Sequence, residues 1–155
     1  MREPTLREPL LGWRVWRVSA GFIEAVVWST AWQPRTRFEA RCEVEPSPFW
    51  QPRVARASHR APSPECECGV YAFKAREDAE LLAREKACHD QLALGRVSLW
   101  GRVIETEYGF RAAYAYPYEL ELLGGSERDA RALRNAYAVD VSCAAAPVPL
   151  HSGSG

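Results

Sequence analysis

Metal-ligating side chains cluster at one place in this chain, around a long proline-rich segment at residues 43–65. Loops of this length are uncommon in compact domains unless something holds them in place or they are disordered. A bound metal ion would hold such a segment by joining its two ends. The side chains that could bind the ion are Cys42, His59, Cys66 and Cys68.

The residues on either side of the segment have the alternating pattern of strands. Residues 35–42 alternate charged with smaller or apolar side chains, which predicts a half-buried strand whose inner face ends at Cys42. In a strand over residues 66–73, Cys66 and Cys68 would share one face. Three thiolates and the imidazole of His59 would form a closed tetrahedral Cys₃His site of the kind that usually holds Zn²⁺.

The same residues allow a second interpretation. Their C-x-C spacing departs from the paired C-x-x-C of zinc ribbons, and free cysteines are often buried as small hydrophobic side chains. His59 would then be an ordinary loop residue. An iron–sulfur cluster is less favoured, because such clusters usually take four cysteines. We expect Cys88 to lie on a helix core face and Cys143 to follow the last helix, so both are left out of the site.

The motif and three later segments, at residues 99–103, 109–112 and 115–117, resemble a family of small, uncharacterised bacterial proteins, with similarity over most of the chain. The family pattern is Trp-x-Pro, a Cys, a His before a Pro, then Cys-x-Cys-Gly and an aromatic-Ala pair. This resemblance implies a shared site but brings no activity with it. The matching residues here are Trp32, Pro34, Cys42, His59, Pro62, Cys66, Cys68, Tyr71 and Ala72.

Two β-hairpins are predicted on either side of the proline-rich segment. Residues 13–18 and 22–28 are rich in aromatic and β-branched types and flank a short turn with a glycine. Residues 97–103 and 110–116 alternate in the same way, and Pro117 is expected to end the second hairpin. The tryptophans of the first hairpin are expected to fill a small core, since aromatic side chains dominate burial in small domains.

Two helices complete the predicted α+β fold. The first is expected over residues 76–94, where Gly95 would stop it, and the second after Ser126, an N-cap with Asp129 three residues later. Glycines in or beside the strands favour kinks and bulges. The sequence therefore predicts a strongly bent antiparallel or barrel-like sheet with one inserted helix and one C-terminal helix.

Composition and length limit the class of protein. An apolar fraction of 47% and six tryptophans predict one folded domain, placed at residues 12–143 between flexible ends at residues 1–11 and 144–155. Twenty basic and twenty acidic residues cancel, so no global charge favours nucleic acid or an anionic membrane. No apolar run approaches the roughly 20 residues of a membrane span, and no signal-peptide layout occurs. We therefore expect a cytoplasmic protein without a membrane partner.

No phosphate-binding loop, nucleophile elbow or H-E-x-x-H motif is present, and Glu105 and Glu107 flank a turn as solvent-facing side chains. A closed zinc site also leaves no position for catalytic water. These points favour a non-enzymatic recognition module for a protein or nucleic acid partner. The alternatives are an enzyme of unknown reaction that uses the metal or a thiol, and loop arginines that only solubilise the segment or balance the thiolates. The candidate partner-binding residues are Trp50, Arg53, Arg56 and Arg60.

Overall fold

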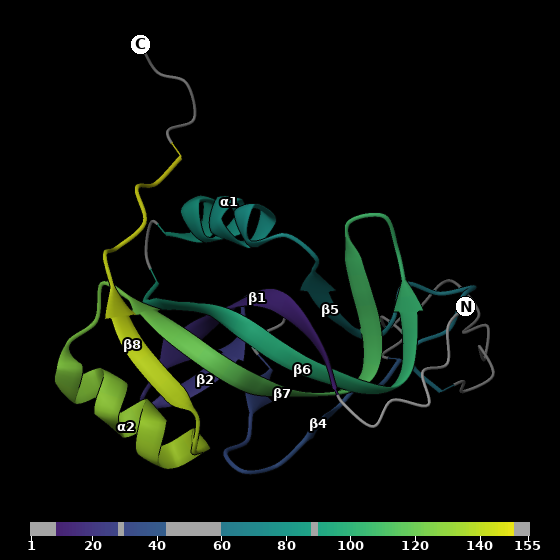
Figure 1. Cartoon of the computed structure of the whole chain (residues 1–155), viewed down its shortest axis with the longest axis horizontal. Coiled ribbons are helices and arrows are strands. Elements are labelled where there is room, and N and C mark those ends of the chain that lie inside the picture. Colours follow the sequence, from purple (N-terminus) through teal and green to yellow (C-terminus); the bar gives the residue numbers. More distant parts are fainter. Residues whose placement is uncertain (1–8, 28–29, 43–59, 88–89, 151–155) are drawn as a thin grey trace, which may run out of the picture.

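The computed structural model describes residues 9–27, 30–42, 60–87 and 90–150. These residues form an α+β fold in which two helices pack on one bent, mixed sheet of eight strands (Figure 1), so the predicted fold class is confirmed. The strands are β1 (Leu10–Ser19), β2 (Phe22–Ala25), β3 (Ala31–Trp32), β4 (Phe38–Glu39), β5 (Val70–Phe73), β6 (Leu92–Glu105), β7 (Gly109–Leu123) and β8 (Asp140–Ala144); the helices are α1 (Arg76–Lys86) and α2 (Glu127–Tyr137).

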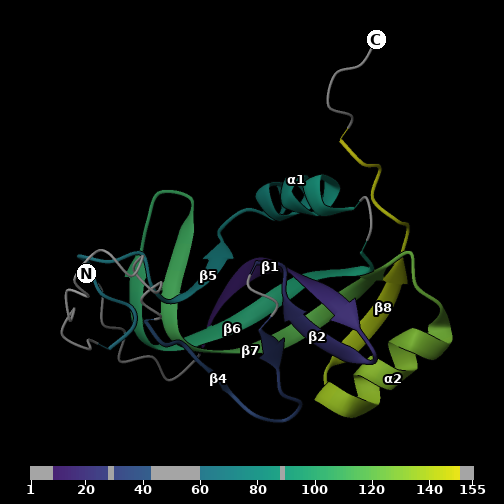
Figure 2. The ribbon, with the colours of Figure 1, turned by 180° about the vertical axis from the view of Figure 1, so that it is seen from behind.

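The long antiparallel hairpin of β6 and β7 is the frame of the sheet. β7 follows one edge of β6 from Leu92 to Glu105, and β1 pairs with the first half of the other edge. The register shifts between Trp100 and Val103, where Gly101 has a φ of 77° that favours glycine. Such irregularities bend a β-ribbon, and the tip of the hairpin turns sharply away from the rest of the sheet (Figures 1 and 2).

Two apolar clusters lie on opposite faces of this sheet. The larger cluster joins Trp16 and Trp32 to Leu133 of α2, and the smaller cluster joins Val15 and Leu92 to the small side chains of α1. Neighbouring residues of one strand go to different clusters because side chains alternate across a sheet. The two helices accordingly lie on opposite sides of the sheet in both views (Figures 1 and 2).

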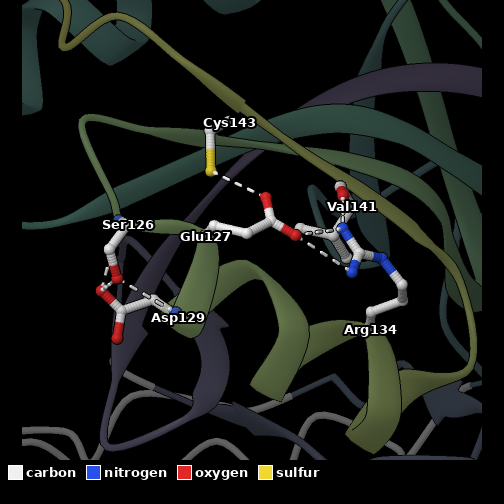
Figure 3. A network of polar contacts seen from close by, with 6 residues as sticks. All are labelled: Ser126, Glu127, Asp129, Arg134, Val141 and Cys143. Carbon is white, nitrogen blue, oxygen red and sulfur yellow. Dashed lines mark hydrogen bonds and ion pairs between the residues drawn. The ribbon is translucent and has the colours of Figure 1, made fainter.

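Helix α2 begins at the predicted N-cap. The Ser126 Oγ accepts a hydrogen bond from the Asp129 N–H at 3.2 Å, and the Asp129 carboxylate accepts one from the Ser126 N–H at 3.4 Å (Figure 3). Near the end of the helix, the Arg134 guanidinium donates to the Val141 carbonyl at 2.6 Å and lies 3.4 Å from the Glu127 carboxylate. The hydrogen bond from Arg134 to Val141 connects the helix to β8.

The two predicted strands beside the proline-rich segment are shorter than expected. β5 begins only at Val70, so Cys66 and Cys68 lie in the preceding loop and do not share a strand face. β4 contains only Phe38–Glu39 of the predicted residues 35–42. The prediction that a shared strand face brings Cys66 and Cys68 together is therefore wrong.

Two further expectations are corrected by the structure, and one strand was not expected. The first helix ends at Lys86, because Leu92 and its neighbours belong to β6 and pair with both β1 and β7. Pro117 does not end the second hairpin, since it lies at a register shift opposite Val97 and the strand continues to Leu123. β8 was not predicted, and it pairs in parallel with the end of β7.

Neither helix of the described chain is both long and apolar enough to span a membrane.

A buried tyrosine of α2 joins the helix to the edge of the sheet. The Tyr137 hydroxyl donates to the Trp32 carbonyl at 2.6 Å and accepts from the Ile23 N–H at 2.9 Å. Burial raises the pKa of Tyr137, so the phenol remains a donor at neutral pH. One side chain thus satisfies a backbone group on each of β2 and β3.

We expect Tyr137→Phe to lower the free energy of unfolding by about 1–3 kcal/mol, because both backbone groups lose their partner in a buried place. Urea denaturation followed by circular dichroism measures this change. Tyr108→Phe is the matched control, since Tyr108 is 65% exposed, and it should leave stability unchanged. Equal stability of the two variants would contradict the role given to Tyr137.

Candidate metal centre

Strand pairing brings together three cysteines that are distant in the sequence. β6 occupies one edge of β7, so β5 and β4 follow one another along the other edge, opposite Gly109–Ala112 and Tyr114–Ala115 respectively. Both strands run antiparallel to β7, and the chain leaving β4 therefore runs toward the start of β5. Cys42 lies just after β4, and Cys66 and Cys68 lie just before β5.

The three sulfur atoms are close enough to bind one ion. The Sγ atoms of Cys42, Cys66 and Cys68 all lie within 4.8 Å of one another, and each side chain is half-buried. The Cys42 and Cys66 sulfurs are 3.6 Å apart, well beyond the roughly 2 Å of a disulfide bond. Thiolates bound tetrahedrally to one Zn²⁺ at about 2.3 Å lie about 3.8 Å apart, so the spacing fits shared coordination.

The thiol of Cys42 favours its neutral form in the absence of a cation. Burial, reinforced by the hydrogen bond with Cys66 and by the nearby Cys68, raises the pKa of Cys42 to about 11. A bound metal ion reverses this preference, because coordination deprotonates a thiol outright. The cluster is thus suited to a thiophilic cation rather than to a reactive thiolate.

Arg111 holds the loop that carries two of these cysteines. This side chain extends from β7 and is only 9% exposed. Its Nη1 donates to the carbonyls of Ser63 at 3.3 Å and Cys68 at 3.0 Å, and also to the carbonyl of Cys66. Backbone carbonyls of an irregular loop need such partners when they are buried. The guanidinium therefore lies against the backbone of the loop that carries Cys66 and Cys68.

Gly69 makes the close approach of this loop to β7 possible. Its φ of 120° is one that side chains with a Cβ rarely adopt. A Cβ at this position would lie 3.0 Å from the Cβ of Pro62 and 3.1 Å from the Cβ of Arg111. The backbone conformation and the close packing therefore require glycine at this position of the C-x-C-G motif, independently of metal binding.

The other predicted site residues fall into two groups. Of the partner-binding residues, only Arg60 lies in the described part, and it is exposed. Cys143 is exposed on β8, where its thiol donates to the Glu127 carboxylate at 3.9 Å (Figure 3), and it is not a member of the cluster. Glu105 and Glu107 are exposed beside their turn. Outside the described residues lie His59, Trp50, Arg53, Arg56 and Cys88.

Sequence reasoning missed Arg111. The alternation of β7 placed Phe110 and Ala112 on the inner face and hence Arg111 toward solvent, although the structure buries all three side chains. The signal that could have found it is a lone arginine between two apolar residues of a predicted strand.

Comparison with protein-family models, with curated proteins and with solved structures finds no match to this chain.

We expect Arg111→Met to weaken Zn²⁺ binding by about ten- to a hundredfold, because groups that orient metal ligands typically contribute that much. Competition with a chromophoric chelator measures this affinity. Arg37→Met is the matched control, since Arg37 is an exposed arginine that lies over the ring of Tyr114. Unchanged affinity in the Arg111 variant would show that the loop keeps its shape without this side chain.

Proposed function

We propose that this protein is a small zinc-stabilised, non-enzymatic recognition module. Cys42, Cys66 and Cys68 supply three thiolates, and His59 supplies the fourth ligand from the proline-rich segment. Zn²⁺ fits this ligand set better than hard cations such as Mg²⁺ or Ca²⁺, since sulfur ligands select thiophilic metals. Four protein ligands leave no position for a metal-bound water, so the ion stabilises structure rather than activating a substrate.

The observation that carries this proposal is the convergence of the three sulfur atoms within 4.8 Å of one another. Residues from two loops meet there although the described part of the chain supplies neither a disulfide nor regular secondary structure between them. A shared ion would supply free energy that holds both loops. The same place carries the motif of the resemblance, which we retain as a proposal that this site is common to the family.

The partner-binding part of the proposal concerns the segment that the ion would hold. Arg53, Arg56 and Arg60 would present guanidinium groups, and Trp50 an aromatic face, to a protein or nucleic acid partner. Arg60, which the structure describes, is exposed as this role requires. The alternative is that these arginines only solubilise the loop or offset the negative charge of a zinc–thiolate centre.

We expect the purified protein to hold close to one Zn²⁺ per chain, and Cys66→Ser and Cys68→Ser to lose it, because a hydroxyl binds Zn²⁺ far more weakly than a thiolate. Elemental analysis measures the content. Removing the ion with a chelator should also lower the melting temperature. Cys143→Ala and Cys88→Ala are the controls that should keep the metal.

His59→Ala separates a closed site from an open one. Loss of Zn²⁺ in this variant supports four protein ligands, whereas full retention would indicate an open fourth position and favour the alternative of a metal-dependent enzyme. Protein isolated without chelator that contains no metal, with equal melting temperatures for all the cysteine variants, would refute the zinc site.

The loop arginines are tested by replacing Arg53, Arg56 and Arg60 together with Ala. We expect the variant to keep its fold and zinc but to lose binding to its anionic partner, and wild-type binding to weaken as salt rises. Fluorescence anisotropy with a labelled single-stranded RNA and with a labelled glutamate-rich peptide measures the two partner classes. Binding that survives the triple substitution would reject this surface, and loss of zinc would instead indicate charge neutralisation.

A further inference from the structure

A wide cleft adjoins the cysteine cluster. Its volume is about 990 Å³, at the upper end of the range for small-molecule sites. The three cysteines line it, together with residues of β1, β2, β3, β4, β5, β7 and α1. Most of its surface is apolar and aromatic. The side chains that line it include Arg14, Trp32, Phe38, Cys42, Cys68 and Tyr71.

Arg14 is a cation on the inner face of a strand. Alternation along β1 places it on the same face as Trp16, which is fully buried in the larger core cluster. Its guanidinium lies 5.0 Å from the centre of the Trp32 ring, and its Nη1 donates to the Tyr71 carbonyl at 2.7 Å. Burial lowers the pKa of Arg14 to about 10, which leaves it charged at neutral pH.

The charge of Arg14 is not balanced by the described residues. No described carboxylate forms an ion pair with it, and its Nε, shielded from solvent, has no hydrogen-bond acceptor in the structure. By contrast, Arg17 on the same strand lies 3.1 Å from Asp90 and 3.5 Å from Glu24. A partly buried cation without an anion is unfavourable, so this position has an unmet need for negative charge.

A second hydrogen-bond donor beside Arg14 also lacks an acceptor. The indole Nε1 of Trp32 is also buried without an acceptor in the structure. The remaining charged side chains that line the described part of the cleft, Glu39, Arg41 and Glu67, are all exposed. Among the described lining residues, Arg14 is therefore the one charged side chain that is not exposed, and its neighbours are mostly apolar side chains and the three cysteines.

We propose that this cleft binds a small organic anion, an apolar or aromatic body that carries one carboxylate or phosphate group, with the anionic group on Arg14. Guanidinium groups bind both anions through charge-assisted hydrogen bonds. The aromatic walls formed by Trp32, Phe38 and Tyr71 cover the body of the ligand. The inference extends the proposed function. It rests on that function in one respect, because the proposed zinc centre would fix the position of the cysteines that line the cleft.

The experiment compares two isosteric probes that differ in charge, 2-naphthoate and 2-naphthamide, by isothermal titration calorimetry on the zinc-loaded full chain. We expect wild-type protein to prefer the carboxylate about tenfold or more. Arg14→Gln should abolish the preference, Arg14→Lys should keep part of it, and Arg37→Gln, the control, should keep all of it. Adding 2-naphthyl phosphate to the series tells whether carboxylate or phosphate is the better anion.

A measurement on the wild-type protein tests the proposal even where a variant does not fold. The ¹⁵N-detected Nε–H resonance of Arg14 should shift on addition of 2-naphthoate and stay in place with 2-naphthamide. The proposal would be overturned if Arg14→Gln kept the wild-type affinities for both probes. It would also be overturned if wild-type protein showed no preference between the probes, or if no probe bound saturably. Zinc content reports separately on the metal centre: protein with zinc but no charge preference refutes the cleft site alone, and a charge preference without zinc refutes the metal alone.

Discussion

Pairing along one edge of β7 determines where three other strands lie. β6 covers one edge, and β5, β4 and β8 occupy the other edge in turn. β4 and β5 bring the chain before and after the proline-rich segment to the same place. The third fastens α2 through Arg134 and the Val141 carbonyl. A single strand of regular structure therefore organises three segments that are irregular or short.

The cysteine loop shows how an irregular segment can be held without a sheet of its own. Its backbone carbonyls are satisfied by the guanidinium of Arg111, and Gly69 allows the close approach that those hydrogen bonds require. The thiols then project from a backbone that is already fixed in place. Order in the loop is thus a precondition for metal binding as much as a result of it.

Features set by neighbouring residues could be predicted from the sequence, and features set by distant ones could not. The capping box of Ser126 and Asp129 and both hairpins are local and were found. The end of α1 was misplaced because the leucines at 92 and 94 fit a helix as well as a strand. Arg111 and the pairing of β8 depend on contacts across the fold. Arg14 was within reach, since alternation alone places it beside Trp16 on the inner face of β1.

Arg111 and Arg14 have different electrostatic roles. Zn²⁺ with three thiolates and a neutral imidazole would carry about one net negative charge, and Arg111 lies against the loop that supplies two of those thiolates. Its charge would therefore offset that of the centre, and its Nη1 donates to backbone carbonyls. Arg14 instead donates to one carbonyl and faces the apolar cleft. With the negative charge of a bound zinc–thiolate centre offset by Arg111, the cleft would keep the positive charge of Arg14, and this is the condition under which an anionic ligand would be recognised.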